Sequence, residues 1–566
     1  MRASGKRKKI HGMAHRLTRL FAAIGLLVPA AVACGASAQP DSGDAAPSPT
    51  SSPTGTTSPT GSVPPDVDGA APDAGDGGAP SPPYDGAQAK ASHNSYERDE
   101  PLFDQLVHHK LRALELDIHN GKRFQPSLAN DFYVYHFDAP GFDGTSCTKL
   151  SDCIGALAAY HRAVPEHEVV TVFVDVKDDF EAFHSPDDLD AQLLKLGRAA
   201  IFTPSDWLAR CQGARTLRGA VAPPCSMPKL DELRGKVVFA LTGGTSCGAG
   251  SKLEAYVAGG AEKRVGFIAP ETSQECSLAE YEANKKHVVF LNFEAGATAT
   301  ASEAARARYL TRVYNLNDPA SFGRAKAAGA HFLGTNNVNA FEDPWATTAS
   351  ADGYPFTCLG GCPGRRELGD VLGLEARSGD LVGAADGVYF VHEPNVADAV
   401  TWTAGISMAS SHVDRGAEGC LMARASIDQG APFFAVCRPA DVDTVRVFRR
   451  ETASANVATA TASYPTDGAY SSESTFFARL TVTPQGAGSR VKGEGSVDGV
   501  RWVTIDERTY AVRLALHGIA ATGKAAAPSR AYFAGLTRAV SGSSAPGRSK
   551  LTAAETIGQV TGRRVD

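Results

Sequence analysis

The sequence predicts an α/β protein, a TIM-type (β/α)8 barrel followed by an antiparallel β-sandwich. Over residues 85–383, apolar runs of strand length alternate with helix-like stretches, which is the pattern of a barrel built from βα units. Over residues 384–545, helical periodicity fades and short alternating runs are separated by turn signals, which is typical of a sandwich. Polar residues also follow three early strand-like runs, where such a barrel presents its site.

The N-terminus predicts an exported protein. Basic residues at 6–9 precede an apolar run, Leu20–Ala33, which is too short for an ordinary membrane span. Ala31-Val32-Ala33 before Cys34 resembles a bacterial lipobox, so residues 1–34 are expected to be a signal peptide with a lipobox. The expected location is extracellular, or on the cell surface as a lipoprotein. Ordinary cleavage after a small-x-small pattern is the alternative.

A tether is expected between this leader and the first domain. Residues 35–84 are rich in Pro, Ser, Thr and Gly and contain no Lys or Arg, which predicts a disordered linker. The net charge of the chain is −6, and it becomes −13 without the basic residues of 1–33. This acidic balance argues against nucleic-acid binding.

The cysteines favour disulfides. Apart from Cys34 there are ten, an even number that fits an oxidising compartment. Close spacing suggests the pairs Cys147–Cys153, Cys211–Cys225, Cys247–Cys276, Cys358–Cys362 and Cys420–Cys437. A zinc site is disfavoured, because no Cys-x-x-Cys pair is present.

The barrel is expected to use eight strands. These are Ala87–His93, Arg112–Ile118, Phe132–Phe137, Val169–Val176, Lys236–Leu241, His287–Phe293, Arg312–Leu316 and His331–Leu333, with Arg264–Ile268 as another candidate. The helix-like stretches include Pro101–Lys110, Lys149–His161, Pro186–Arg198 and Ala301–Leu310. His108 and His109 fall on the first of these and are expected to be solvated. Residues 201–235 are irregular, contain two cysteines and predict a stapled insertion.

The sandwich is expected over residues 384–545. Its predicted strands include Thr444–Arg449, Thr475–Thr483, Ser489–Gly495, Arg501–Ile505 and Val512–His517. Residues 546–566 are expected to be a polar, frayed tail.

Paired carboxylates mark the second predicted strand. Side chains at i and i+2 of a strand share a face, so Glu115 and Asp117 point together into the barrel. Two desolvated carboxylates repel each other, and a cation between them removes that cost. A salt-bridge partner at the barrel rim is the alternative for either residue.

Two histidines lie near the same end. His93 and Asn94 follow the first predicted strand, and His136 shares a face with Val134 in the third. Histidine supplies acid–base chemistry near neutral pH, while the Asn94 amide oxygen can join carboxylates around a hard cation. Structural rim histidines are the alternative. With the carboxylates, these residues predict cleavage of a phosphodiester.

Later strands add further candidates. Asp175 and Lys177 share a face of the fourth strand, where Asp175 would complete a cation shell and Lys177 would meet a substrate phosphate. An Asp–Lys ion pair is the alternative. Weaker candidates are Asn292, Glu294, Arg312 and Asn336.

The motifs Ser92-His93-Asn94-Ser95-Tyr96, Leu114-Glu115-Leu116-Asp117 and Tyr135-His136 resemble those of bacterial calcium-dependent phosphoinositide phospholipases C. The resemblance covers about 86–340. It implies that His136 is the general acid and that His93 stabilises the phosphoryl transition state or shares the base role. It also implies a Ca²⁺ site of Asn94, Glu115 and Asp117, with Asp175 at a fourth carboxylate position. Arg312 falls in a segment that resembles one of the family's last strands and joins Lys177 as a substrate-binding candidate. The expected products are diacylglycerol and a cyclic inositol phosphate.

The C-terminal part has a resemblance of its own. The segments 419–426, 496–502 and 531–536 resemble those of bacterial concanavalin-like sandwich domains. Such domains are found attached to secreted enzymes, so a glycan or surface ligand is a further expectation beside a purely structural role. The main partner expected is a phospholipid at a membrane surface.

Two alternatives remain open from the sequence. A glycerophosphodiester phosphodiesterase would use similar groups, although its first motif is usually His-Arg instead of His-Asn. A non-catalytic surface-binding protein is the other, and the presence of both histidines and the oxygen ligands argues against it.

Overall fold

The structure is a computed structural model. It describes residues 81–139, 145–243, 251–271, 285–349, 353–359, 371–394, 398–408, 416–442, 444–464, 476–523, 528–541, 551, 553–557 and 562–565. The predicted signal peptide, Cys34 and nearly all of the predicted linker lie outside this part of the chain. Within the described residues, no helix is both long and apolar enough to cross a membrane.

Eight parallel strands form the barrel, in the order β6-β5-β4-β2-β1-β9-β8-β7. Their bounds are β1 (Ala87–Ser92), β2 (Ala113–His119), β4 (Val170–Val176), β5 (Val237–Thr242), β6 (Phe267–Ile268), β7 (Phe290–Glu294), β8 (Leu310–Tyr314) and β9 (Phe332–Thr335). A parallel bridge between Glu271 and Asn292 links the segment after β6 to β7. The predicted barrel is therefore confirmed, and this bridge nearly closes it.

One predicted barrel strand is wrong. The run Phe132–Phe137 contains only the short strand β3 (Tyr133–Val134), which pairs antiparallel with β2, Val134 opposite Ile118. Parallel neighbours need a long crossover, usually a helix, and no helix lies between β2 and β3. The eighth barrel strand is instead β6, inside the other candidate, Arg264–Ile268.

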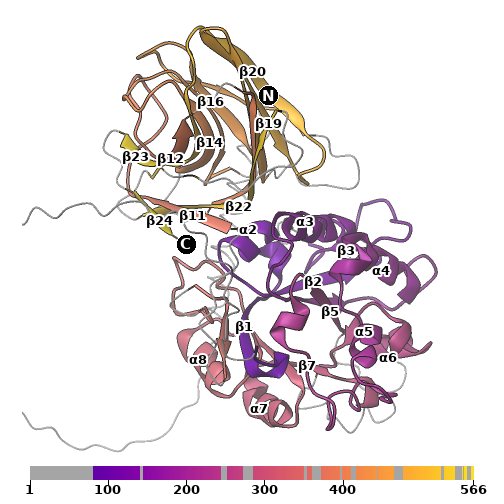
Figure 1. The fold of residues 1–566 in the computed structure, drawn as a ribbon. Coiled ribbons are helices and arrows are strands. Elements are labelled where there is room, and N and C mark those ends of the chain that lie inside the picture. Colours follow the sequence, from indigo (N-terminus) through magenta and orange to yellow (C-terminus); the bar gives the residue numbers. More distant parts are fainter. Residues whose placement is uncertain are drawn as a thin grey trace, which may run out of the picture. The chain divides into compact units, whose positions relative to one another are not determined.

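Helices surround the barrel strands in Figure 1. Their bounds are α2 (Leu102–Val107), α3 (Leu150–Ala163), α4 (Pro186–Leu193), α5 (Pro204–Ala209), α6 (Lys252–Val257), α7 (Thr298–Arg306) and α8 (Pro319–Ala327). Side chains from α2, α3 and α4 share an apolar cluster with outward-facing strand residues such as Leu114 and Val172.

A second apolar cluster fills the barrel interior. It includes Ala113 of β2, Phe173 of β4, Phe290 of β7 and Leu310 of β8. Because side chains alternate along a strand, the residue two positions later in each of these strands faces the same interior. Those residues are Glu115, Asp175, Asn292 and Arg312. The apolar cluster therefore fills the interior below these polar side chains, which lie nearer the carboxyl ends of the strands.

Three predicted disulfides are confirmed, Cys147–Cys153, Cys211–Cys225 and Cys420–Cys437. The second closes the insertion predicted over 201–235, which contains α5. Cys247, Cys276 and Cys362, needed for the other two predicted pairs, lie outside the described residues.

The C-terminal part contains two seven-stranded antiparallel sheets, ordered β20-β19-β18-β13-β22-β11-β24 and β17-β16-β15-β14-β21-β12-β23. The strands are β11 (Val371–Ala376), β12 (Val388–Pro394), β13 (Val400–Met408), β14 (Glu418–Arg424), β15 (Phe433–Pro439), β16 (Arg446–Arg450), β17 (Ala458–Ala460), β18 (Phe477–Gln485), β19 (Gly488–Ser496), β20 (Val503–Tyr510), β21 (Leu516–Ala521), β22 (Ser529–Val540), β23 (Ala553–Ile557) and β24 (Gly562–Val565). An apolar cluster with residues from both sheets, including Trp402 and Phe434, forms the core. The predicted sandwich architecture is confirmed.

The sandwich extends beyond residues 384–545 at both ends. Strand β11 lies before residue 384 and pairs with β22, so it belongs to the sandwich. The predicted polar tail contributes β23, which pairs with β12, and β24, which pairs with β11. The tail is therefore not simply frayed, because backbone pairing with sequence-distant strands holds these segments.

Buried polar contacts join the barrel to the sandwich. Asp104 of α2 accepts two hydrogen bonds of 2.6 Å from the Arg438 guanidinium and one of 2.7 Å from Ser407. Phe103 stacks on Phe476 with ring centroids 4.8 Å apart. These contacts lie within one compact unit, Pro80–Asp566.

Candidate active site

Three carboxylates, two buried and one partly buried, meet inside the carboxyl end of the barrel. Asp117 of β2 lies in register with Asp175 of β4, and Glu115 stands on the same face of β2. One carboxylate oxygen from each lies within 4.8 Å of the others. The period-two prediction for Glu115 and Asp117 therefore holds, and the parallel register adds Asp175.

Two cations neutralise part of this charge. Arg312 Nη2 of β8 lies 2.7 Å from Glu115 Oε2, and its Nη1 donates to Asn292 Oδ1 at 2.9 Å. Lys177 Nζ lies 3.1 Å from Asp117 Oδ2 and also pairs with Asp175. Three carboxylates therefore share one lysine and one arginine, and a protonated His136 beside Asp117 would add a third positive charge.

The cluster has the donor set of a hard cation site. Oδ1 of Asp117 and Oδ1 of Asp175 are buried and have no hydrogen-bond partner among the described residues. A buried carboxylate oxygen without a partner is costly, and a cation would satisfy both of these oxygens. All three side chains offer oxygen ligands, which suit Ca²⁺ or Mg²⁺.

The carboxyl groups respond differently to their neighbours. Burial raises the pKa of Glu115, but Arg312, His93 and the Asn94 N–H together hold that pKa below its ordinary value. Burial also raises the pKa of Asp117. The hydrogen bond from His136 and the positive charge of Lys177 act in the opposite direction and hold that pKa below its ordinary value. Burial and the neighbouring Asp117 raise the pKa of Asp175. Asp175 is therefore the carboxylate that gains most from an added cation.

His136 lies directly beside this cluster. It follows β3, and its Nδ1 lies 2.9 Å from Asp117 Oδ2. Because a carboxylate oxygen only accepts, Nδ1 donates and Nε2 remains for substrate. The hydrogen bond with Asp117 raises the pKa of His136. The half-buried ring can therefore present a protonated Nε2.

His93 lies at the end of β1, on the Glu115 side of the cluster. Its Nδ1 is 2.9 Å from Asn336 Oδ1, and its Nε2 is 3.8 Å from Glu115 Oε2. The ring also stacks on Tyr314 with centroids 5.4 Å apart. Burial lowers the pKa of His93, although Glu115 acts in the opposite direction. The two histidines are thus held by different partners and shifted in opposite directions.

Asn94 joins the site mainly through its backbone. It adopts a left-handed conformation, with φ of 49°, and its N–H donates to Glu115 Oε2 at 2.9 Å. Its side-chain amide donates to Glu97 Oε2 at 3.2 Å. Asn94 therefore lies beside the predicted ligands, and its role as a ligand stays a prediction.

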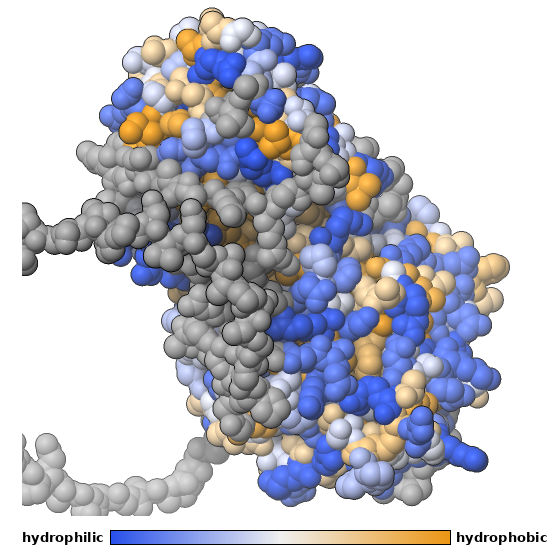
Figure 2. Space-filling view, viewed as in Figure 1, coloured by the Kyte–Doolittle hydropathy of each residue, from blue (hydrophilic) through white to orange (hydrophobic). Residues whose placement is uncertain are grey.

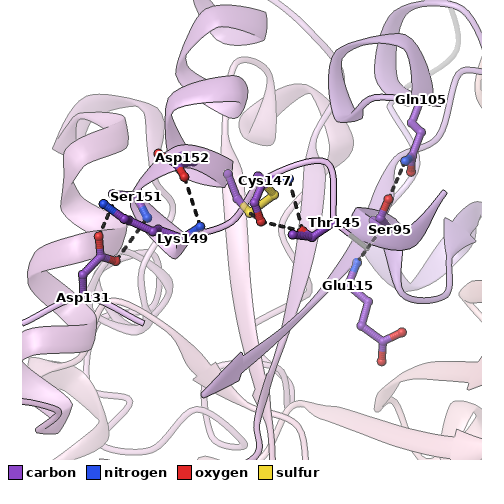
Figure 3. The surroundings of a disulfide bond; sticks show 10 residues. Ser95, Gln105, Glu115, Asp131, Thr145, Cys147, Lys149, Ser151 and Asp152 are labelled. Carbon is purple, nitrogen blue, oxygen red and sulfur yellow. Dashed lines mark hydrogen bonds between the residues drawn. A yellow bond between two sulfur atoms is a disulfide. The ribbon is translucent and has the colours of Figure 1, made fainter. Parts of the chain in front are cut away.

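A short helix holds β2 in place behind the site. Ser95, in the 3₁₀ helix Ser95–Glu97, accepts a hydrogen bond from the Glu115 N–H at 2.8 Å (Figure 3). Its carbonyl accepts from Gln105 Nε2 at 2.7 Å. The Ser146 N–H donates to the Tyr96 carbonyl at 2.7 Å, next to the Cys147–Cys153 disulfide. The segment that leads into α3 is therefore tied to this helix.

The structure brings all eight predicted site residues to one end of the barrel. Sequence reasoning missed Tyr314, which stacks on His93, and Glu271, which accepts a hydrogen bond from the Tyr314 hydroxyl. Tyr314 stands two residues after Arg312 on β8, so strand alternation could have identified it. Glu271 follows the very short strand β6, which gave little sequence signal.

Comparison with solved structures finds similar proteins that cover about half of this chain. A calcium-dependent phosphoinositol-specific phospholipase C from Pseudomonas sp is 20% identical, with a TM-score of 0.41 over 49% of this chain and 95% of that chain. A Ca²⁺-dependent phosphatidylinositol-specific phospholipase C from Streptomyces antibioticus is 19% identical, with a TM-score of 0.39 over 46% of this chain and 96% of that chain. A glycerophosphodiester phosphodiesterase from Parabacteroides distasonis is 10% identical, with a TM-score of 0.28 over 46% of this chain and 96% of that chain. No protein-family model and no curated protein matches the chain.

Proposed function

We propose that this protein is an exported phosphoric diester hydrolase, a calcium-dependent phospholipase C that cleaves phosphatidylinositol-type lipids. The observation that carries the proposal is one arrangement at the barrel mouth. His93 and His136 flank three carboxylates, two of which have buried oxygens without a hydrogen-bond partner among the described residues. Paired histidines next to a cation site suit in-line displacement at phosphorus.

His136 is the general acid of this proposal. Asp117 accepts its Nδ1–H, which orients the ring and favours the protonated form. Nε2–H would then donate its proton to the departing diacylglycerol oxygen, so that the leaving group departs as a neutral alcohol.

His93 is the complementary base or transition-state partner. If Nδ1 donates to Asn336 Oδ1, Nε2 keeps its lone pair. That nitrogen can accept the proton of the inositol 2-hydroxyl as it attacks the phosphorus. Opposite shifts of two titratable groups in one site are the usual mark of an acid and base pair.

Glu115, Asp117 and Asp175 would hold the cation, with Asn94 beside them. A bound Ca²⁺ would supply positive charge near the phosphoryl oxygens and lower the pKa of the attacking hydroxyl. Lys177, which is partly exposed, would add charge for a phosphate. Arg312 is fully buried and already pairs with Glu115 and Asn292, so its main contribution is to fix the position of Glu115.

The expected first product is a cyclic inositol phosphate. The ring hydroxyl and the phosphorus belong to one molecule, so attack gains the advantage of an intramolecular reaction. An external water is not needed for this first step.

Product analysis with three substrates tests this proposal. The full chain would be incubated with phosphatidylinositol, phosphatidylcholine and glycerophosphoinositol, with Ca²⁺ or with a chelator. Release of cyclic inositol phosphate from phosphatidylinositol alone supports the proposal. Cleavage of glycerophosphoinositol to free glycerol phosphate would instead support a glycerophosphodiester phosphodiesterase. Absence of cleavage in all three would favour a surface-binding protein.

A further inference from the structure

The ammonium group of Lys177 lies in an unusual place for a partly exposed lysine. Figure 2 shows hydrophilic and hydrophobic residues interspersed over the face that it draws, and a lysine on such a surface keeps its ammonium group in water. The Lys177 side chain, directly after β4, is 29% exposed, yet its ammonium group turns to two carboxylates of the site. Nζ lies 3.1 Å from Asp117 Oδ2 and also pairs with Asp175 Oδ2. The charge of Lys177 is therefore neutralised within the protein.

These two ion pairs use only one oxygen of each aspartate. The ammonium group contacts Oδ2 of Asp117 and Oδ2 of Asp175, while both Oδ1 atoms are buried without a hydrogen-bond partner among the described residues. A divalent cation bound to these carboxylates would stand close to Lys177 Nζ, and the two positive charges would repel each other. The cation and the ammonium group therefore compete for the same two aspartates.

The other cationic side chain of the site, Arg312, is held from several sides. It is fully buried, lies 2.7 Å from Glu115 Oε2 and donates to Asn292 Oδ1 at 2.9 Å. Its guanidinium carbon also lies 4.9 Å from the ring centroid of Phe173 and 5.1 Å from that of Tyr314. Four side chains thus fix the guanidinium group, and we expect its pairing with Glu115 to persist when a cation binds.

Lys177 differs from Arg312 because the structure fixes its backbone more than its side chain. Its N–H donates to the Ile118 carbonyl at 3.0 Å, and the Lys252 ammonium group donates to the carbonyls of Val176 and Lys177. Beyond this backbone, a flexible four-carbon stem carries the ammonium group. Rotation within the stem can therefore move Nζ away from the aspartates while β4 stays in place.

Departure of the Lys177 ammonium group would leave the rest of the site intact. Asp117 Oδ2 would keep its contact with His136 Nδ1 at 2.9 Å, so the proposed general acid would stay oriented. Asp175 would regain Oδ2, so both of its oxygens would be available to a cation. The released ammonium group would lie at the carboxyl end of the barrel, and a compact positive charge of this kind suits a phosphate.

We propose that Lys177 is a displaceable counterion, which neutralises Asp117 and Asp175 in the absence of a cation, leaves them when a divalent cation binds, and then pairs with the substrate phosphate. The inference rests on the proposed function, which supplies both the cation and the phosphate. It predicts that the cation and a phosphate bind cooperatively, because the first ligand releases a partner for the second.

Calorimetric titration of the full chain with Ca²⁺ tests the competition without any assay of activity. Lys177→Met keeps most of the apolar stem and removes the competing charge, so it should bind Ca²⁺ at least about 10-fold more tightly than the unchanged protein. Lys122→Met is the matched control. It removes the same charge three residues after β2, where Lys122 Nζ lies 5.5 Å from the Tyr135 ring centroid. Its Ca²⁺ affinity should change by less than about 3-fold.

Binding of myo-inositol 1-phosphate tests the second half of the proposal. This phosphomonoester has no diester bond for the enzyme to cleave. In saturating Ca²⁺, Lys177→Met should bind it about 10-fold more weakly than the unchanged protein, because the released ammonium group is missing. In chelator the two proteins should differ by less than about 3-fold, because Lys177 is then engaged with the aspartates. If Lys177→Met does not fold, Lys177→Gln provides the same comparison, since it also lacks the charge.

Other outcomes separate this inference from the proposed function. Equal or weaker Ca²⁺ binding by Lys177→Met, with cleavage of phosphatidylinositol by the unchanged protein, overturns the counterion and leaves the proposed function standing. An equal loss of inositol phosphate affinity in chelator also overturns it, because Lys177 would then reach the phosphate without being displaced. Tighter Ca²⁺ binding by Lys177→Met, without cleavage of any inositol lipid by the unchanged protein, supports the counterion and overturns the proposed function. Absence of Ca²⁺ binding by both proteins overturns the counterion together with the calcium dependence of the proposed function.

Discussion

Oδ2 of Asp117 lies 2.9 Å from Nδ1 of His136. The same oxygen lies 3.1 Å from Lys177 Nζ, while Oδ1 of Asp117 has no partner among the described residues. Asp117 therefore has one oxygen for the proposed general acid and another for the proposed cation. Acid–base chemistry and cation binding are expected to depend on each other through this carboxylate.

Thermal unfolding tests the cation site without any assay of activity. Asp175→Asn should remove most of the rise in Tm that Ca²⁺ produces, because a ligand that binds only the folded state stabilises it. In chelator the same change should be neutral or stabilising, since burial and Asp117 already raise the pKa of Asp175. Asp178→Asn is the control, because Asp178 pairs with His119 instead. A full Ca²⁺ response in Asp175→Asn would remove Asp175 from the site.

Arg312→Met tests the neutralisation of Glu115. The change leaves a buried carboxylate without its 2.7 Å partner, so the free energy of unfolding should fall by about 3–5 kcal/mol. Glu115→Gln combined with Arg312→Met should recover much of that loss. Arg306→Met, on the exposed face of α7, should change stability by less than about 0.5 kcal/mol. Denaturant unfolding measures the free energy of unfolding of all three variants. If Arg312→Met loses no more stability than Arg306→Met, Arg312 does not neutralise Glu115.

Arg438→Met tests the coupling of barrel and sandwich. Asp104 would lose both 2.6 Å hydrogen bonds while remaining buried, so stability should fall by about 3–5 kcal/mol. Asp104→Asn together with Arg438→Met should be less damaging than Arg438→Met alone. If the contacts between Asp104 and Arg438 are required for stability, the barrel and the sandwich should unfold together in calorimetry. Two separate transitions in the unchanged protein would contradict this coupling.

Asp386→Asn tests a buried charge cluster within the sandwich. Asp386 pairs with Arg424 and Arg450, and all three side chains are fully buried. Burial raises the pKa of Asp386, but the two arginines act more strongly together and hold that pKa below its ordinary value. The carboxylate therefore contributes stability above its unfolded-state pKa of about 3.9, and this is lost as pH falls through the lower folded pKa.

Asp386→Asn should accordingly lower the free energy of unfolding by about 3–5 kcal/mol near neutral pH and flatten its decline in acid. Urea unfolding at a series of pH values below 5 measures both effects. Parallel curves for the variant and the unchanged protein would show that Asp386 does not cause the acid dependence.

Much of the site could be predicted because it depends on local periodicity. Strand alternation put Glu115 with Asp117 and Asp175 with Lys177, and the structure places each pair on one face. The third predicted strand was wrong because a polar residue after a short apolar run fits a hairpin as well as a barrel strand. His136 reaches the site from that hairpin, so its place depends on an antiparallel pairing that periodicity does not distinguish.

Long-range contacts account for the other differences. His108 was expected to be solvated, but it is buried against Tyr532 of β22, with ring centroids 4.8 Å apart. Nothing near His108 in the sequence indicates that a sandwich strand covers α2. Likewise, β24 shows no pattern beyond a polar tail, and it is ordered by pairing with β11.

The most direct test of the central claim is the release of cyclic inositol phosphate from phosphatidylinositol by the full chain. It would be measured with Ca²⁺ and with chelator for the unchanged protein, His136→Ala and His287→Ala. The last is the control, because His287 precedes β7 at the opposite end of the barrel. We predict Ca²⁺-dependent release that falls by about 10²–10⁴-fold in His136→Ala and is kept in His287→Ala. Release that persists in chelator, or that survives in His136→Ala, would contradict this account of the site.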